Sequence, residues 1–70
     1  MKEKSLFLKI GKKIQEIRES KNLTQDDLSA KANLHNIGRL ETGNTNPTIR
    51  TLYKVSQALN VTIKDLVDVE

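Results

Sequence analysis

The amino-acid sequence predicts an all-α domain of five short helices. Apolar residues recur at steps of three and four along most of the chain, the spacing that gives a helix one apolar face. Asn, Gly and Pro residues separate these stretches, where helices are expected to end. No segment alternates between apolar and polar residues for long enough to indicate a β-sheet. The 70 residues fall short of the roughly 100–200 usual for a domain, so we expect one domain over residues 1–70.

The first predicted helix covers about residues 6–21, and the second begins at Thr24. Ser5 is placed to cap the first helix with its hydroxyl. Thr24, followed three residues later by Asp27, is typical of a capping box at the start of the second helix. The inward-facing apolar residues of these two helices are expected to be Leu6, Ile10, Ile14 and Ile17, then Leu28 and Ala32.

Three further helices are predicted over about residues 36–42, from residue 48 onward, and over about residues 63–69. Pro47 blocks continuation of the third helix into the fourth. Thr62 and Asp65 repeat the capping-box pattern before the fifth. The fourth helix is expected to bury Ile49, Leu52, Val55 and Leu59, and the third to bury Ile37 and Leu40. The residues expected to end helices are Asn22, Asn33, Gly43 and Asn60.

The composition excludes several classes of protein. The chain has no Cys and a single His, His35, so thiolate or multi-imidazole metal sites are excluded and no cofactor is expected. No acid–base pair or activated nucleophile of an enzyme is recognisable. No apolar run approaches the roughly 18–20 residues of a membrane span, and residues 6–8 are too short for the core of a signal peptide. We therefore expect a cytoplasmic protein with no membrane partner.

The charges of the chain divide unevenly between its ends. The net charge is +3 and the sequence pI is about 9.4. Residues 1–21 carry seven basic and three acidic side chains, a net +4, whereas residues 61–70 carry one basic and three acidic side chains, a net −2. The basic end suits a polyanionic partner such as nucleic acid, and a soluble surface of uneven charge is the alternative.

Residues 23–43 have the pattern of a helix-turn-helix, with the motif itself over about residues 24–42. In that arrangement the first helix lies across the phosphate backbone of DNA and the second lies in the major groove. The outward residues of the second helix and of the turn before it are His35, Asn36 and Arg39, side chains suited to base edges or phosphates. The pattern alone also fits a helical bundle that binds no DNA.

The chain as a whole resembles the XRE, or Cro/CI-type, family of phage and bacterial repressors. The motifs that carry the resemblance are Ile14-x-x-Ile17-Arg18-x-x-Lys21, Leu23-Thr24-Gln25-x-x-Leu28-Ser29, Arg39-Leu40-Glu41-x-Gly43, Asn46-Pro47-Thr48 and Leu52-x-x-Val55-x-x-Ala58-Leu59-Asn60-Val61. The length is similar to that of stand-alone controller proteins of restriction–modification systems and of small phage repressors. The resemblance implies a lambda-repressor-like fold and sequence-specific binding of double-stranded DNA by a transcriptional regulator.

One segment departs from the family pattern. Residues 32–41 are about two positions shorter than the usual spacing, and the missing positions fall at the start of the recognition helix. The helix is trimmed by half a turn, the turn before it is rebuilt, or a stretch of chain is absent from this sequence. All three readings leave the expected fold unchanged and bear on the base contacts.

The resemblance also assigns roles to individual residues. It implies that Gln25 anchors the DNA backbone and that the loop after the third helix meets sugar and phosphate. It implies a structural salt bridge between Arg18 and Glu41. The residues expected to contact DNA are Gln25, His35, Asn36, Arg39, Asn44, Thr45, Thr48 and Arg50. The alternatives are that Asn36 caps a short helix, that His35, Asn44 and Thr45 are turn residues, and that the remaining side chains are solvated.

A homodimer on a palindromic operator is expected, because one short recognition helix reads too few base pairs to select a site in a genome. The last helix has more apolar residues than it can bury, with Leu66 facing the core and Ile63, Val67 and Val69 left as the dimer interface. Residues 6–8 are a second candidate interface. The alternative function is a protein-interaction module, in which the last helix binds a toxin or a protein antagonist and DNA binding is secondary. Salt-dependent binding to duplex DNA separates the two.

Overall fold

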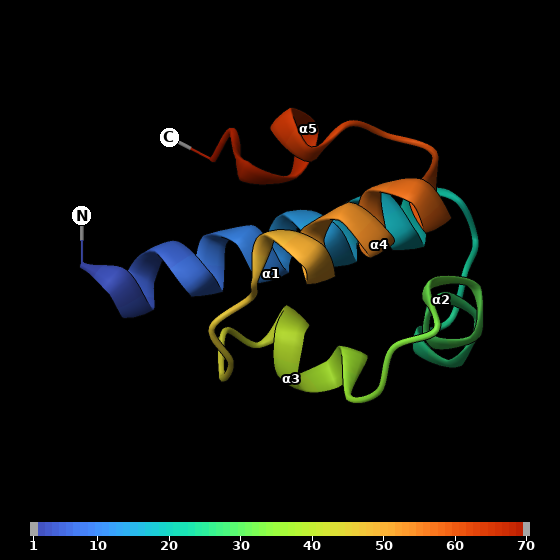
Figure 1. Ribbon diagram of the computed structural model, residues 1–70, viewed down its shortest axis with the longest axis horizontal. Coiled ribbons are helices and arrows are strands. Elements are labelled where there is room, and N and C mark those ends of the chain that lie inside the picture. Colours follow the sequence, from blue (N-terminus) through green and yellow to red (C-terminus); the bar gives the residue numbers. More distant parts are fainter. Residues whose placement is uncertain (1, 70) are drawn as a thin grey trace.

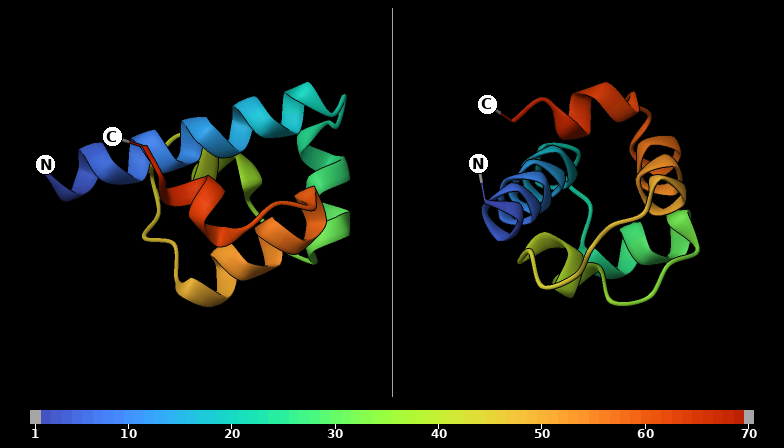
Figure 2. Two further views of the ribbon diagram at one scale, coloured as in Figure 1. Left: turned by 90° about the horizontal axis from the view of Figure 1, so that it is seen from above. Right: turned by 60° about the vertical axis from the view of Figure 1, so that its left-hand side comes forward.

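The computed structural model describes residues 2–69, which form five helices and no strand. The helices are α1 (Glu3–Ser20), α2 (Gln25–Ala32), α3 (Ile37–Glu41), α4 (Ile49–Leu59) and α5 (Ile63–Val67). Helices α2 and α3 lie on one side of α1 and α4, and α5 lies on the other side (Figures 1 and 2). The prediction of an all-α domain of five helices is confirmed.

The core is made of side chains from all five helices. The fully buried residues Ile14, Leu28, Leu59 and Leu66 come from α1, α2, α4 and α5, and α3 adds Ile37 and Leu40. Their spacing of three and four residues along each helix turns one face of that helix toward a common centre. The other buried apolar residues are Ile10, Ala32, Leu52 and Val55.

The helix ends follow the capping signals of the sequence. Thr24 and Thr62 each form a capping box with the aspartate three residues later. The backbone N–H of each threonine donates to its aspartate and lowers the pKa of Asp27 and of Asp65. The stabilisation from these carboxylates is present above the ordinary aspartate pKa and is lost as the pH falls through the lowered value. Asn22, Asn33 and Asn60 end α1, α2 and α4 in the left-handed region, with φ of 59°, 53° and 58°.

Three helix bounds and the burial of one residue differ from the sequence predictions. Helix α1 begins at Glu3, so Ser5 lies inside the helix and caps nothing; the Leu6 amide already donates to the Lys2 carbonyl at 3.0 Å. Helix α3 starts one residue late, because Asn36 has a φ of 59°. Helix α5 ends at Val67, because Asp68 has a ψ of 78°. Ile49 is 71% exposed rather than buried, since the first residue of α4 extends past the core.

Two glycines let α3 and its following loop approach α1 closely. A Cβ on Gly11 would lie 2.6 Å from the Glu41 carbonyl oxygen, and one on Gly43 would lie 2.7 Å from the Cα of Leu8. Gly43 also has a φ of +75°, a conformation that other residues rarely adopt. A side chain at either position would push α3 or its following loop away from α1. The two glycines therefore allow this close approach.

A buried ion pair joins α1 to α3. Arg18 Nε and Nη2 donate to the two carboxylate oxygens of Glu41 at 2.7 and 3.1 Å, and the two residues are only 6% and 4% exposed. Arg18 Nη1 donates to the Leu23 carbonyl at 2.6 Å. The hydrogen bond to Glu41 raises the pKa of Arg18 above its ordinary value. Every buried side-chain nitrogen and oxygen within residues 2–69 has a partner, so the burial of both charges is compensated.

We predict that Arg18→Met lowers the free energy of unfolding by about 3–5 kcal/mol, because it leaves the Glu41 carboxylate buried without its partner. The double variant Arg18→Met, Glu41→Leu should recover much of that loss, since no lone charge remains in the interior. Urea denaturation of the wild type, both single variants and the double variant completes the cycle. Additive losses would show that the two residues are not energetically coupled.

Candidate nucleic-acid interface

The turn between α2 and α3 is unusually tight. Asn33 and Asn36 both adopt left-handed conformations, with φ of 53° and 59°, and only two residues separate them. The Leu34 amide donates to the Ser29 carbonyl at 3.1 Å, and the Ser29 hydroxyl donates in return to the Leu34 carbonyl. Two hydrogen bonds between Ser29 and Leu34 therefore stabilise the turn, and α3 begins directly after the left-handed Asn36.

Helix α3 is short as a consequence. It has five residues, from Ile37 to Glu41. Asn36 occupies the position before the helix, but its side chain makes no capping hydrogen bond. The alternative in which Asn36 caps a short helix with its side chain is therefore not supported. A five-residue helix that follows a left-handed Asn36 fits both a trimmed recognition helix and a rebuilt turn.

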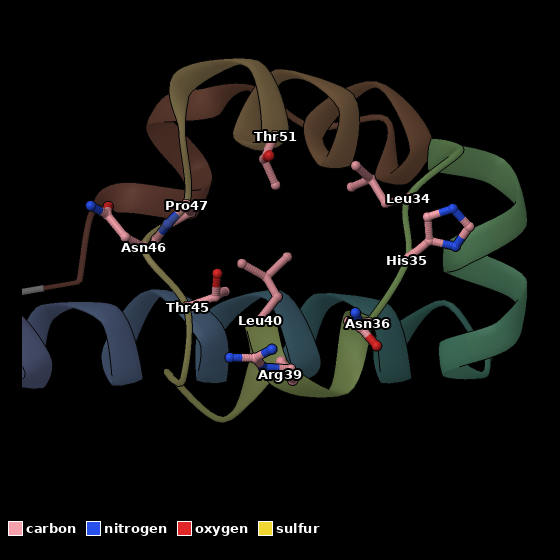
Figure 3. A pocket seen from close by; sticks show the side chains of 9 residues that line it. All are labelled: Leu34, His35, Asn36, Arg39, Leu40, Thr45, Asn46, Pro47 and Thr51. Carbon is pink, nitrogen blue, oxygen red and sulfur yellow. The ribbon is translucent and has the colours of Figure 1, made fainter.

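The eight residues expected to contact DNA are all exposed, and they come from α2, the α2–α3 turn, α3, the following loop and the start of α4. Four of them line a hollow of about 170 Å³ between α3 and the α3–α4 loop (Figure 3). These four are His35, Asn36, Arg39 and Thr45; the other lining residues are Leu34, Leu40, Asn46, Pro47 and Thr51. The lining includes one Arg and no carboxylate, so the hollow attracts electronegative groups.

Arg39 ties the loop to α3. Its Nη2 donates to the Asn44 carbonyl at 3.3 Å, while the Asn44 side-chain amide donates to the Thr42 hydroxyl at 2.9 Å. The Thr42 hydroxyl in turn donates to the Gly38 carbonyl at 2.9 Å. These bonds hold the loop against the end of the helix, and they use one of the five N–H donors of Arg39.

The Gln25 side chain lies against α3 rather than pointing away from the protein. Its Nε2 donates to Glu41 Oε1 at 3.0 Å. Its amide oxygen would lie 3.4 Å from a Cβ on Gly38, so the glycine leaves room for the glutamine. The contact joins α2 to the buried ion pair. A phosphate contact for Gln25 remains a prediction, and sequence reasoning missed this structural role.

The hydroxyl of Thr48 is engaged inside the protein. It accepts a hydrogen bond from the Thr51 amide at 3.1 Å and lies 3.1 Å from the Thr51 hydroxyl. The side chain therefore caps α4, and a phosphate at this end would meet the backbone amides of the first turn. Arg50 lies on that turn and is exposed.

The apolar residues expected to form the dimer interface are arranged differently from the prediction. Val67 is 39% exposed, but Ile63 and Val69 are half-buried against the core, because α5 is short and lies flat on α1 and α4. The most exposed large apolar side chains on α4 are Ile49, at 71%, and Tyr53, at 54%. They are four residues apart and share a face. The spacing of Ile49 also fits the buried stripe of α4, so the sequence did not reveal this second exposed face.

Residues 2–69 hold neither a metal-binding cluster nor a membrane-spanning helix. No group of three or more His, Cys, Asp or Glu side chains there is arranged to hold a metal ion. No helix there is both long and apolar enough to cross a bilayer.

Comparison with known proteins gives consistent results. A family model described as "Helix-turn-helix" matches residues 14–66. The chain is 39% identical over 67 residues to the control protein C.BamHI of Bacillus amyloliquefaciens, covering 91% of this chain and 83% of that protein. It is 37% identical over 60 residues to an uncharacterised HTH-type transcriptional regulator, y4dJ, of Sinorhizobium fredii, covering 83% and 78%.

The fold also matches a solved structure. The restriction–modification controller protein C.AhdI of Aeromonas hydrophila superposes with a TM-score of 0.84 and 27% identity, over 86% of this chain and 94% of that one. The expected family resemblance and the five-helix fold are therefore confirmed.

We predict that Gln25→Ala destabilises the fold by about 1 kcal/mol, because Glu41 loses a hydrogen bond to its buried carboxylate. The control is Gln57→Ala, which removes an exposed glutamine of α4. Urea denaturation compares the two. Equal stabilities for the two variants would mean that the Gln25 contact with Glu41 contributes nothing to the fold.

Proposed function

This chain belongs to the helix-turn-helix family of DNA-binding transcriptional regulators, and we propose that it acts as a homodimer on a palindromic operator. The family and the named relatives are regulators rather than enzymes, and the proposal assigns no catalytic step to this chain. A cytoplasmic location is part of this proposal.

The observation that carries the proposal is the grouping of polar and basic residues around α3. Residues of the turn, the helix and the loop line one hollow without a carboxylate. The acidic residues Asp65 and Asp68 belong to α5 and its end, on the other side of α1 and α4 from α3 (Figure 1). A polyanion at α3 therefore meets Arg39 and the polar groups beside it and lies away from Asp65 and Asp68. The exposed carboxylates next to Gln25 are Asp26 and Asp27, on the first turn of α2.

The proposed complex places α3 in the major groove. Asn36 and Arg39 stand three residues apart and read base edges, since amide and guanidinium groups bond bases bidentately. Asn44 and Thr45 in the loop, with Arg50 and the amides of the first turn of α4, contact phosphates and fix the register of the helix on the duplex. Gln25 and His35 border the same face, where a phosphate is the proposed partner of each.

The proposed dimer surface consists of Ile49, Tyr53 and Val67, which we call the α4–α5 surface. Helix α5 packs against α4, and these three are among the four large apolar residues found exposed within residues 2–69. A two-fold axis through the surface would bury each copy against its equivalent. The short α3 supports a dimer, because each good base contact discriminates by only about 1–3 kcal/mol and one helix makes few of them.

The exposed side chains of α4 also suit a second candidate function. Ile49 and Tyr53 offer an apolar face that a toxin or a protein antagonist could cover instead of a second copy. In that case DNA binding would be secondary, and the isolated chain would sediment as a monomer.

We predict that binding to the operator falls steeply with salt, because phosphate contacts release counterions. Arg39→Ala should weaken operator binding by about 1–3 kcal/mol and weaken binding to random duplex much less, if Arg39 reads a base. Lys12→Ala on α1 also removes one positive charge, at an exposed site beside Asp68, and serves as the control. Fluorescence anisotropy across a range of salt concentrations measures each affinity.

Two results would count against this account. Binding that is absent at low salt, or that does not change with salt, would contradict the proposed function. Equal losses of Arg39→Ala on operator and on random duplex would make Arg39 a phosphate contact.

We predict that Val67→Asp and Tyr53→Asp each give a folded monomer with wild-type helical content and greatly reduced operator binding, since a carboxylate would be buried at the two-fold axis. Leu8→Asp is the control, because Leu8 is 51% exposed on α1 and lies outside the α4–α5 surface. Sedimentation at micromolar concentration reports the mass. A wild-type monomer, or a dimer lost only in Leu8→Asp, would place the interface elsewhere.

A further inference from the structure

The hollow beside α3 has two chemically different parts. Leu34, Leu40 and Pro47 give it an apolar lining, and Leu40 belongs to the core. Polar groups complete its edge, from Asn36 and Arg39 on one side and from the loop and α4 on the other (Figure 3). A ligand that fits must therefore combine an apolar group with a neighbouring hydrogen-bond acceptor.

The chain takes a short path into the helix that borders the hollow. Helix α3 begins only after Asn36, whose left-handed φ of 59° turns the chain directly into the helix. Leu40 and Thr51 face each other across the space in Figure 3. The buried Leu40 and the half-buried Leu34 and Thr51 form the floor, which a group of the DNA could reach through the open side of the hollow.

A phosphate is a poor occupant of this hollow. Its charged oxygens would lie against Leu34, Leu40 and Pro47, and desolvating a charge against apolar groups is unfavourable. The major-groove edge of a thymine fits better, because it places a methyl group next to the O4 acceptor. The methyl group would contact the apolar lining, and O4 would accept from Arg39 or Asn36.

We propose that this hollow receives the 5-methyl edge of one thymine in each half of the operator. The inference rests on the proposed function, since it requires α3 in the major groove. Cytosine would be rejected there, because it lacks the methyl group and presents an N4 donor toward the donors of Arg39. The site would thus select thymine by shape and by hydrogen bonding together.

Deoxyuridine tests the methyl contact, since it differs from thymidine only in lacking that group. In the palindromic duplex recovered by selection from random sequence, each thymine is replaced by deoxyuridine in turn. We expect affinity to fall about three- to fivefold at one symmetric pair of positions, the change that corresponds to burying one methyl group. The other thymines of the same duplex are internal controls.

A filled hollow should abolish that preference. Thr51 is half-buried on α4 and its side chain lines the hollow, so Thr51→Leu adds apolar volume where the methyl group would lie. Thr51→Ser leaves the space open and keeps the hydroxyl beside Thr48. We expect Thr51→Leu to bind the thymine and deoxyuridine duplexes equally and Thr51→Ser to keep the difference.

The outcomes separate this inference from the function on which it rests. If the wild type binds the palindrome specifically but no thymine is sensitive to deoxyuridine, the hollow does not read thymine and the proposed function stands. A thymine preference that survives in folded Thr51→Leu places the methyl contact elsewhere and also overturns the inference. If the chain binds no duplex, both proposals fail. The deoxyuridine scan uses the unaltered protein, so it does not depend on the folding of a variant.

Discussion

The arrangement of the candidate interface depends on the buried guanidinium of Arg18. It donates to both carboxylate oxygens of Glu41 and to the Leu23 carbonyl, so one side chain on α1 holds the last residue of α3 and the chain entering α2. Gln25 adds a bond from α2 to the same carboxylate. A helix of five residues is far below the roughly 12–15 at which isolated helices become marginal. Helix α3 therefore exists because tertiary contacts hold it.

The same contacts set the position of the side chains proposed to meet DNA. Gly11 allows α1 to approach the end of α3, and Gly43 allows the following loop to pass beside Leu8. Arg39 then fastens that loop to the helix through the Asn44 carbonyl. These contacts hold the helix and the loop together, and groups that are already held in place lose less conformational freedom when they bind. Substituting Arg18 or Glu41 would therefore disturb the candidate interface, although neither side chain contacts DNA in the proposed complex.

The sequence predicted the features that depend on local chemistry. Threonine–aspartate pairs and left-handed asparagines marked helix ends correctly, because their hydrogen bonds form within a few residues. Predictions that depend on tertiary position were less reliable. The spacing of Ile49 matches a buried stripe, but the core ends before the first residue of α4. Ile63 and Val69 were expected outside, yet the short α5 turns them toward α1 and α4. The hydrogen bonds that Gln25 and Thr48 make within the protein could not be predicted from the sequence either, because both side chains are equally suited to a phosphate contact.

In the proposed complex, two copies of the short α3 read a two-fold symmetric duplex. Selection of bound sequences from a random pool of double-stranded DNA, followed by sequencing, tests it most directly. The account predicts an inverted repeat whose half-sites are centred about one helical turn, or a whole number of turns, apart. Enrichment of a single unrepeated half-site, or of no sequence at all, would contradict it.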